Sequence, residues 1–143
     1  MCAIGGIIDP EFANTASLPG PLRRMARAMF HRGPDEEGLV VEPGIGLIHR
    51  RLSIIGLGNG RQPLTNEDGS VIAIVNGEFF DHVEKREWLE RRGHVLHTDS
   101  DCEILAHLYE EYGQDFPLKI EDYTLQAQSS IPNTNGKVGS LKK

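Results

Sequence analysis

The sequence predicts an α/β fold of the α+β kind, built as one domain. Short apolar stretches rich in β-branched residues occur along the chain, together with longer stretches whose apolar residues recur at helical spacing. The chain has 143 residues, of which 38% are hydrophobic, and this is enough for one hydrophobic core. Together these observations indicate a globular domain that contains both helices and sheet.

The first predicted elements are a strand and a helix. Residues 3–8 (AIGGII) form a short apolar run that ends at Asp9-Pro10, which is typical of a buried strand. A helix is predicted from about Pro21, because proline suits the first helical turn and an apolar face follows it. This face consists of Leu22, Met25, Ala26 and Met29. Gly33-Pro34 marks the end of the helix.

Four further strands are predicted in the middle of the chain. They cover residues 39–41, 46–48, 52–55 and 71–75. The last run, VIAIV, is unbroken and mostly β-branched, which favours a strand buried on both faces. Asn76-Gly77 follows directly, and this dipeptide on its own favours a type I′ hairpin turn.

Two helices are predicted beyond these strands. The first runs from about Asp81 to Arg92, where Asp81 and Glu84 have the spacing of a capping box and Gly93 can end the helix. The second begins at Ser100, again with an acid three residues on, and ends at Gly113. The residues that this second helix is expected to bury are Ile104, Leu105, Leu108 and Tyr112.

The composition limits the classes of function. A net charge of −6 argues against a nucleic-acid binder, which normally presents a basic face. No stretch is long enough to span a membrane, and the N-terminus lacks the basic and apolar regions of a signal peptide. We therefore expect a soluble cytoplasmic protein without a nucleic-acid or membrane partner, in which Cys2 and Cys102 stay reduced.

Cys2 directly follows the initiator methionine, and removal of Met1 would give this residue a thiol and a free α-amine together. The thiol is a nucleophile, and an α-amine, with an ordinary pKa of about 7.7–8.0, can act as its base near neutral pH. The alternative is an ordinary, partly buried thiol, because cysteine is among the residues most often buried in proteins. Taken alone, the position of Cys2 favours this second interpretation.

Six short segments in a fixed order change that balance. They are MCAI at the N-terminus, HRGPDEEG (31–38), HRRLSI (49–54), QPL (62–64), NGE (76–78) and SDCEIL (100–105). In this order they closely resemble the glutaminase domain of class II glutamine amidotransferases, and most of all the N-terminal half of glutamine-hydrolysing asparagine synthetases, over residues 2–116. The resemblance implies an N-terminal-nucleophile hydrolase fold, in which two mostly antiparallel sheets lie between helical layers (αββα).

The resemblance implies a catalytic role for three residues. Cys2 matches the nucleophile of the family, whose thiolate attacks the side-chain amide of glutamine to give a γ-glutamyl thioester and ammonia. Asn76 and Gly77 match the oxyanion hole, through the side-chain N–H of the asparagine and the backbone N–H of the glycine. The resemblance also implies that Glu78 lines the glutamine pocket.

Other positions match the glutamine-binding residues of the family. Arg51 matches the residue that grips the α-carboxylate, and Asp101 matches the one that pairs with the α-ammonium group. The alternatives for these two are a surface arginine and an acid that supports a helix dipole. Because neighbours on a strand point to opposite faces, we expect only one of Arg50 and Arg51 to face the pocket. The backbone groups that the family uses belong to positions matching Ile54 and Ile55.

The sequence predicts no metal site and no cofactor in this chain. Histidines such as His94 and His97 are present, but the further ligands at workable spacing and the CxxC pair typical of zinc sites are not. ATP and Mg²⁺ are expected only in the synthetase domain of the family, because the SGGxDS pyrophosphate loop of that domain does not occur here.

The predicted function is hydrolysis of L-glutamine to glutamate and ammonia, for transfer to an acceptor such as aspartate in a synthetase domain or partner subunit. The family domain continues with further strands beyond the position of Phe116, whereas polar residues 117–143 follow here. We therefore expect incomplete sheets with exposed edges and a poorly ordered tail. Two alternatives stay open: a non-catalytic, truncated remnant that binds glutamine or a partner subunit, and a fragment that does not fold alone.

Overall fold

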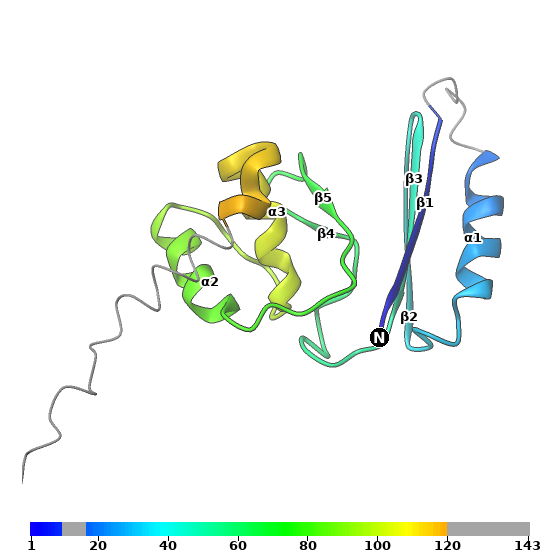
Figure 1. The fold of residues 1–143 in the computed structure, drawn as a ribbon, viewed down its shortest axis with the longest axis horizontal. Helices are drawn as coiled ribbons and strands as arrows, with labels where there is room; N and C mark the ends of the chain where they lie inside the picture. The colour runs from blue at the N-terminus through cyan, green and yellow to red at the C-terminus, as the bar shows by residue number, and fades with distance from the viewer. Residues whose placement is uncertain (10–16, 120–143) are drawn as a thin grey trace, which may run out of the picture.

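The computed structural model describes residues 1–9 and 17–119, so most of the predicted tail lies outside the described residues. The elements form four layers in the order helix, sheet, sheet, helices (Figure 1). Helix α1 (Pro19–Ala28) covers one face of a three-stranded sheet, and a two-stranded sheet lies on its other side, covered by α2 (His82–Arg91) and α3 (Ile104–Tyr112). Both sheets are antiparallel, so the predicted αββα architecture is confirmed.

The first sheet has the strand order β1-β3-β2. Its strands are β1 (Ala3–Ile8), β2 (Glu36–Glu42) and β3 (Ile45–Arg51). The prediction that β1 is a buried strand holds for one face alone, because Ala3 is buried whereas Ile4 and Ile8 are exposed. The reason is that β1 is an edge strand covered on one face only. The face turned toward α1 carries Ile7, which packs against the helix cluster.

Helix α1 is the helix predicted from about Pro21, and its predicted apolar face is confirmed. This face packs on the first sheet in a core cluster that consists of buried Leu18, Leu22, Ala26 and Ile48, with Met25 and Met29 partly buried against it. The close approach of helix and sheet depends on Gly46, because a Cβ at this position would lie 2.6 Å from Cδ1 of Leu22.

Within the described residues, the second sheet consists of β4 (Leu64–Thr65) and β5 (Ile72–Ala73). The prediction of a strand over residues 71–75 buried on both faces is therefore wrong, since two residues pair and all five are partly exposed. The backbone N–H groups of Val71 and Val75 donate to the side-chain oxygens of Asn66 and Gln62, at 2.9 and 2.6 Å. Side-chain acceptors thus take the place of a partner strand at both ends of this run.

The strand predicted over residues 52–55 is also wrong. Strand β3 ends at Arg51, after which the N–H of Leu52 points to the sulfur of Cys2 at 3.4 Å. The next N–H, that of Ser53, donates to a carboxylate oxygen of Asp35 at 2.7 Å. Because side chains satisfy these backbone groups, the chain leaves the sheet here and forms a loop.

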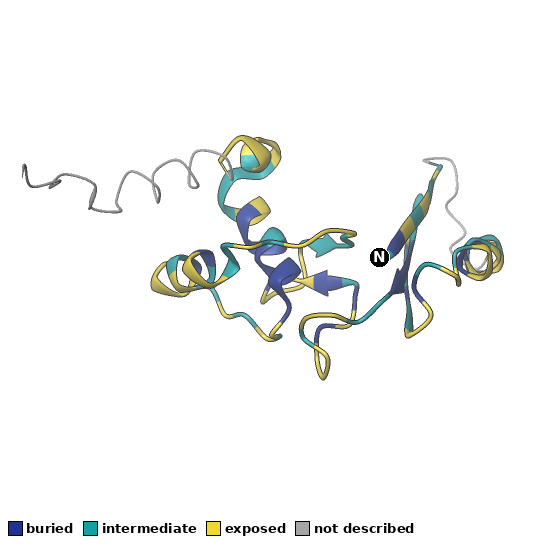
Figure 2. Cartoon of the chain, turned by 60° about the horizontal axis from the view of Figure 1, so that its bottom comes forward, coloured by how far each residue is buried: buried dark blue, intermediate teal, exposed yellow. Residues whose placement is uncertain are grey.

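The two later helices enclose a second core cluster. Its buried members are Leu89, Ile104 and Leu108, and the rings of Trp88 and Tyr112 stack beside them with centroids 5.9 Å apart. Leu105 and Tyr112 were predicted to be buried but are partly exposed. Figure 2 shows that buried residues concentrate on β3 and at the start of α3, so each half of the molecule has its own core.

The capping box predicted at Asp81 and Glu84 does not form. Asp81 is the N-cap residue of α2, but its carboxylate pairs with Lys85 and makes no capping hydrogen bond. The salt bridge within the first turn therefore replaces the predicted cap. Gly93 follows the helix with a positive φ of 102°, as expected of a residue that ends a helix.

The turn at Ser100 begins as predicted. Its hydroxyl accepts a hydrogen bond from the N–H of Cys102 at 3.3 Å, and a short 3-10 turn, η2 (Asp101–Glu103), leads into α3. The buried carboxylate of Glu103 accepts hydrogen bonds from the N–H groups of His97 and Thr98, at 2.6 and 2.8 Å. Gly113 ends α3 with a φ of 56° and begins a second 3-10 turn, η3 (Gly113–Asp115).

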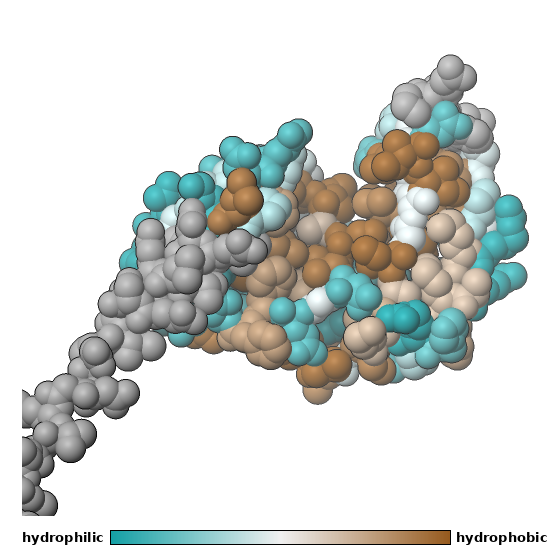
Figure 3. All heavy atoms as spheres, in the orientation of Figure 1, coloured by the Kyte–Doolittle hydropathy of each residue, from teal (hydrophilic) through white to brown (hydrophobic). Residues whose placement is uncertain are grey.

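The half formed by α1 and the first sheet and the half formed by the second sheet, α2 and α3 are not in contact along their whole length. A hollow of about 310 Å³ lies between the sheets, lined by Leu47, residues 71–75, Leu105, Tyr109 and Phe116. Figure 3 shows a notch with apolar walls between the halves. Within the described residues the two sheets are thus open at this point, as expected from the sequence. None of the helices in the described part of the chain is long and apolar enough to cross a membrane.

Candidate active site

A cavity of about 380 Å³ opens beside the start of β1. It is lined by all eight residues singled out in the sequence: Cys2, Arg51, Ile54, Ile55, Asn76, Gly77, Glu78 and Asp101. These residues come from four stretches of the chain that are far apart in sequence, and the αββα fold brings them together. The volume is that of a site for a small molecule.

Cys2 lies half-buried at the N-terminal end of β1. Its sulfur is 3.4 Å from the N–H of Leu52 and 3.6 Å from the carbonyl oxygen of the same residue. Its own carbonyl accepts a hydrogen bond from Nε of Arg32 at 3.2 Å. The thiol is therefore held against the end of β3, with a backbone N–H directed at the sulfur.

The segment from Arg32 to Asp35 packs against Cys2 and the end of β3 and supports this arrangement. A Cβ on Gly33 would lie 2.4 Å from the carbonyl of Arg50, so only glycine permits this close approach. Nε of Arg50 donates to the carbonyl of Gly33 at 2.8 Å, and the N–H of Asp35 donates to the carbonyl of Arg51 at 3.0 Å. The segment thus fixes the end of β3, on which the cavity residues depend.

Of the two neighbouring arginines of β3, Arg51 faces the cavity and Arg50 does not. Arg51 lines the cavity, and its guanidinium group donates to Glu36 at 2.8 Å and to the carbonyls of Ile55 and Gly56, both at 2.7 Å. Arg50 does not line the cavity; its guanidinium lies over the ring of Phe30, 4.9 Å from the centroid. Arg51 therefore shapes the loop after β3 as well as the cavity wall.

Asp101 and Cys102 form the opposite wall, in η2. The carboxylate of Asp101 accepts a hydrogen bond from the N–H of Phe79 at 2.8 Å, which ties η2 to the loop that carries Asn76 and Gly77. Burial, and then the negative charge of Asp101, raise the pKa of the Cys102 thiol to about 12. Cys102 is thus a neutral, unreactive wall residue, and both cysteines are free.

The loop that carries Asn76 and Gly77 is fixed one residue earlier, at Val75. The N–H of Val75 donates to Oε1 of Gln62 at 2.6 Å, and its carbonyl faces Nε2 of His49 at 3.0 Å. Strand β5 ends at Ala73, so this pair of side-chain contacts, which we call the Val75 clamp, holds the loop in place of a strand. Asn76 and Gly77 themselves are exposed to the cavity.

Sequence reasoning missed the two side chains of this clamp. His49 and Gln62 both lie in motif segments, HRRLSI and QPL, but their types suggested no chemical step. Burial lowers the pKa of His49 and the nearby charge of Arg51 lowers it further, against opposing effects of the Val75 carbonyl and Glu36. Because a carbonyl only accepts hydrogen bonds, the neutral His49 ring carries its proton on Nε2.

Fold and cavity define a small αββα domain with a thiol at the N-terminal end of its first strand. Comparison with known proteins supplies the family. A family model described as a glutamine amidotransferase domain matches residues 1–123 of this chain. The chain therefore belongs to the glutamine amidotransferase domain family, as its six sequence segments predicted.

Individual relatives agree with the family match. The chain is 42% identical over 117 residues to asparagine synthetase (glutamine-hydrolyzing) 2 of Bacillus subtilis (strain 168), covering 81% of this chain and 15% of that protein. It is 49% identical over 116 residues to the asparagine synthetase (glutamine-hydrolyzing) of Sandersonia aurantiaca, covering 81% and 22%. A third, asparagine synthetase (glutamine-hydrolyzing) 1 of Arabidopsis thaliana, is 48% identical over 116 residues, covering 81% and 19%. This chain thus spans about a fifth of the length of these relatives.

Proposed function

We propose that this chain hydrolyses L-glutamine to glutamate and ammonia, with Cys2 as the nucleophile. The observation that carries the proposal is the cavity, because it gathers from four distant stretches all eight residues that match the motifs of the family. A thiol, hydrogen-bond donors, a cation and a carboxylate in one small cavity are the groups that amide hydrolysis of an amino acid requires.

The first step is attack by the sulfur of Cys2 on the side-chain amide carbon of glutamine. Met1 is exposed, so its removal is sterically possible, and the α-amine of Cys2 then takes the thiol proton. The C–N bond of the amide breaks, the amine returns the proton to the leaving nitrogen, and ammonia departs. Water then cleaves the γ-glutamyl thioester, which gives glutamate and restores the thiol.

Asn76 and Gly77 supply the donors for the oxyanion of the tetrahedral intermediate. Loss of one such donor typically costs about 2.7–4 kcal/mol of transition-state stabilisation, provided that the donor is fixed before the reaction. The Val75 clamp supplies this fixation next to Asn76. The residue that precedes the donors is thus held through both its N–H and its carbonyl.

Arg51 and Asp101 bind the amino-acid end of the substrate in this proposal. The guanidinium has five N–H donors, of which Glu36 and two carbonyls use three within the described part of the chain, and the other two can serve an α-carboxylate. The Asp101 carboxylate has lone pairs beyond the one that binds the N–H of Phe79, and these suit an α-ammonium group. Ile54, Ile55 and Glu78 complete the wall.

The relatives are named as asparagine synthetases, and this suggests where the ammonia goes. We propose that it passes to an acceptor such as aspartate in a synthetase domain or partner subunit, where ATP and Mg²⁺ are used. The domain formed by residues 2–116 needs neither for the glutaminase half of the reaction. We place the reaction in the cytoplasm, which keeps thiols such as Cys2 and Cys102 reduced.

The test is a glutaminase assay on the full chain, combined with its intact mass. We expect a mass that lacks Met1, release of glutamate and ammonia in equal amounts, and no product from Cys2→Ala. A thermal melt of Cys2→Ala with and without glutamine shows whether the variant is folded and still binds. Ammonia release that survives Cys2→Ala contradicts the nucleophile, and an active chain that retains Met1 contradicts the amine base. Protection by glutamine without any product supports the binding remnant instead.

A further inference from the structure

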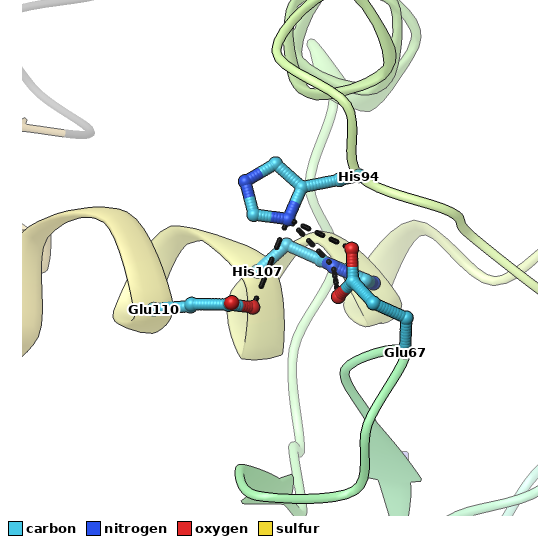
Figure 4. A group of neighbouring side chains, drawn as sticks. All are labelled: Glu67, His94, His107 and Glu110. Atoms are coloured by element: carbon cyan, nitrogen blue, oxygen red, sulfur yellow. Dashed lines mark hydrogen bonds and ion pairs between the residues drawn. The ribbon is translucent and has the colours of Figure 1, made fainter.

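Four side chains that the proposed reaction does not use meet near the turn between β4 and β5, where this turn approaches α3. They are Glu67 from the turn between β4 and β5, His94 from the segment after α2, and His107 and Glu110 from α3 (Figure 4). One ligand atom from each lies within 4.8 Å of the others. None of these residues lines the cavity that contains Cys2.

The distances between these atoms are those of a metal coordination sphere. Nδ1 of His94 lies 3.2 Å from Glu67, 3.7 Å from Glu110 and 3.4 Å from Nδ1 of His107. Nδ1 of His107 lies 3.1 Å from the other oxygen of Glu67. Tetrahedral zinc with bonds of about 2.0–2.1 Å places its ligand atoms about 3.3 Å apart. The four separations of 3.1–3.7 Å are close to this spacing, and all four groups lie within 4.8 Å of one another, so they can converge on one zinc ion.

The surroundings of His94 fix which of its nitrogens faces the cluster as a lone pair. Its Nε2 lies 3.1 Å from a carboxylate oxygen of Glu111, which in turn binds Arg92 at 2.7 Å. A carboxylate only accepts hydrogen bonds, so Nε2 carries the proton and Nδ1 of the neutral ring is a lone pair. That lone pair faces the oxygens of Glu67 and Glu110, and a cation between them removes the repulsion.

His107 also presents Nδ1 to the cluster, and it does so from a fully buried position. Its Nδ1 faces the cluster, and among the described residues its Nε2 has no hydrogen-bond partner, with Oε1 of Glu103 3.9 Å away. The carboxylate of Glu103 is thus the acidic group behind the His107 ring, at a longer distance than Glu111 lies behind His94. Histidine ligands of zinc are commonly oriented in this way, by a carboxylate behind the second ring nitrogen.

The carboxylate members are oriented by further hydrogen bonds. Nδ2 of Asn66 donates to Oε2 of Glu110 at 3.0 Å, and the N–H of Val95 donates to Oε1 of Glu67 at 3.1 Å. The side chains of Glu67 and Glu110 are 29% and 40% exposed, so an ion can enter from solvent between them. Two carboxylates and two neutral imidazoles also balance the charge of one divalent ion.

We propose that Glu67, His94, His107 and Glu110 bind one zinc ion. Two imidazoles favour zinc over magnesium or calcium, which prefer oxygen ligands alone. Four protein ligands close the tetrahedron, which is typical of a structural site. The ion joins the β4–β5 turn, the segment after α2 and α3, three segments that the short second sheet does not hold together. This site was not predicted from the sequence, because its ligands are far apart along the chain.

The test uses the full 143-residue chain with Cys2→Ser, so that this thiol does not bind zinc. The chain is stripped with a chelator and titrated with Zn²⁺ or Mg²⁺ in a calorimeter. We expect one Zn²⁺ per chain, no Mg²⁺ binding at matched concentration, and a higher melting temperature with zinc. Substitution of Glu67→Gln or Glu110→Gln is expected to weaken zinc binding at least about tenfold.

The matched control is Glu90→Gln, which changes an exposed glutamate of α2 outside the cluster and is expected to leave zinc binding unchanged. Because Glu67 and Glu110 are partly exposed, their variants are expected to fold, and a melt without metal verifies this. The proposal is overturned if the stripped chain takes up no zinc. It is also overturned if both glutamine variants bind zinc as tightly as the control.

Discussion

Nε2 of His49 lies 3.0 Å from the carbonyl oxygen of Val75, a residue 26 positions further along the chain. The N–H of Val75 is held at the same time by Gln62, at 2.6 Å. These contacts connect β3 and the loop before β4 to the residue that directly precedes Asn76. The proposed oxyanion donors therefore owe their position to two side chains rather than to a strand.

Substitution Gln62→Leu is expected to lower kcat for glutamine hydrolysis by about tenfold or more, since it releases the loop that carries the oxyanion donors. It leaves the N–H of Val75 without its acceptor, so the free energy of unfolding is expected to fall by about 1–3 kcal/mol. Steady-state kinetics and urea unfolding measure the two effects. The control Gln114→Leu changes an exposed residue and is expected to alter neither. An unchanged kcat in Gln62→Leu contradicts the role of the clamp.

The lowered pKa of His49 predicts that the free energy of unfolding decreases at acidic pH. Its pKa is lowered in the folded protein, first by burial, so below about pH 6.5 the unfolded chain takes up a proton that the folded chain does not. The stability that comes from keeping His49 neutral is fully present above about pH 6.5. It is lost as the pH falls from about 6.5 toward the lowered pKa. Urea unfolding at pH 7 and pH 5 measures it. The variant His49→Gln, which keeps a donor for Val75, is expected to show a smaller difference; an equal difference excludes His49 as its source.

Local sequence patterns were enough to predict the parts of the molecule that depend on nearest neighbours. The apolar face of α1 follows from the spacing of Leu22, Met25, Ala26 and Met29, because helical geometry puts residues three and four apart on one face. The order of the six motif segments led to the eight cavity residues, and the fold gathers all of them. Their chemical roles stay predictions until activity is measured.

Features that depend on distant partners were not predictable in this way. The β-branched run at residues 71–75 shows a preference for extended backbone, but it does not show whether a partner strand exists. Asn66 and Gln62 instead bind its N–H groups, through contacts that no local pattern specifies. The cluster around His94 and His107 was missed for the same reason, since three separate segments supply its members.

Gly38→Ala is expected to destabilise the protein through a backbone clash. A Cβ at Gly38 would lie 1.8 Å from the carbonyl oxygen of Gln62, so the QPL loop must move and carry Gln62 away from Val75. We expect the free energy of unfolding to fall by about 1–3 kcal/mol, as for other overpacked sites. Gly58→Ala is the matched control, because its Cβ would meet nothing within 4 Å. Equal melting temperatures for the two variants would show that the loop adapts without cost.

The two cysteines are expected to differ in reactivity toward iodoacetamide at pH 8. Cys102 is 4% exposed and its pKa is raised to about 12, so almost none of it is thiolate, whereas Cys2 lines the open cavity. Peptide mapping by mass spectrometry is expected to find the label on Cys2 alone. The variant Cys2→Ser should then take up no label. Rapid labelling of Cys102 in the folded chain would contradict this description of the cavity wall.

Arg51→Lys tests whether the planar guanidinium is needed for glutamine. The guanidinium bridges Glu36 and the carbonyls of Ile55 and Gly56 with donors left over, whereas a lysine ammonium cannot span these groups and a carboxylate together. We expect KM for glutamine to rise about tenfold, which corresponds to about 1.4 kcal/mol of lost binding, with a smaller change in kcat.

Arg50→Lys is the matched control for this substitution, because Arg50 is also buried in β3 but contacts Gly33 and Glu37 instead of the cavity. It is expected to lower the melting temperature, since the contact with Gly33 is lost, without raising KM. If both variants raise KM equally, the effect comes from the loss of β3 geometry, and Arg51 does not bind the substrate. A rise in KM confined to Arg51→Lys supports direct contact with the α-carboxylate, because both variants disturb the same strand.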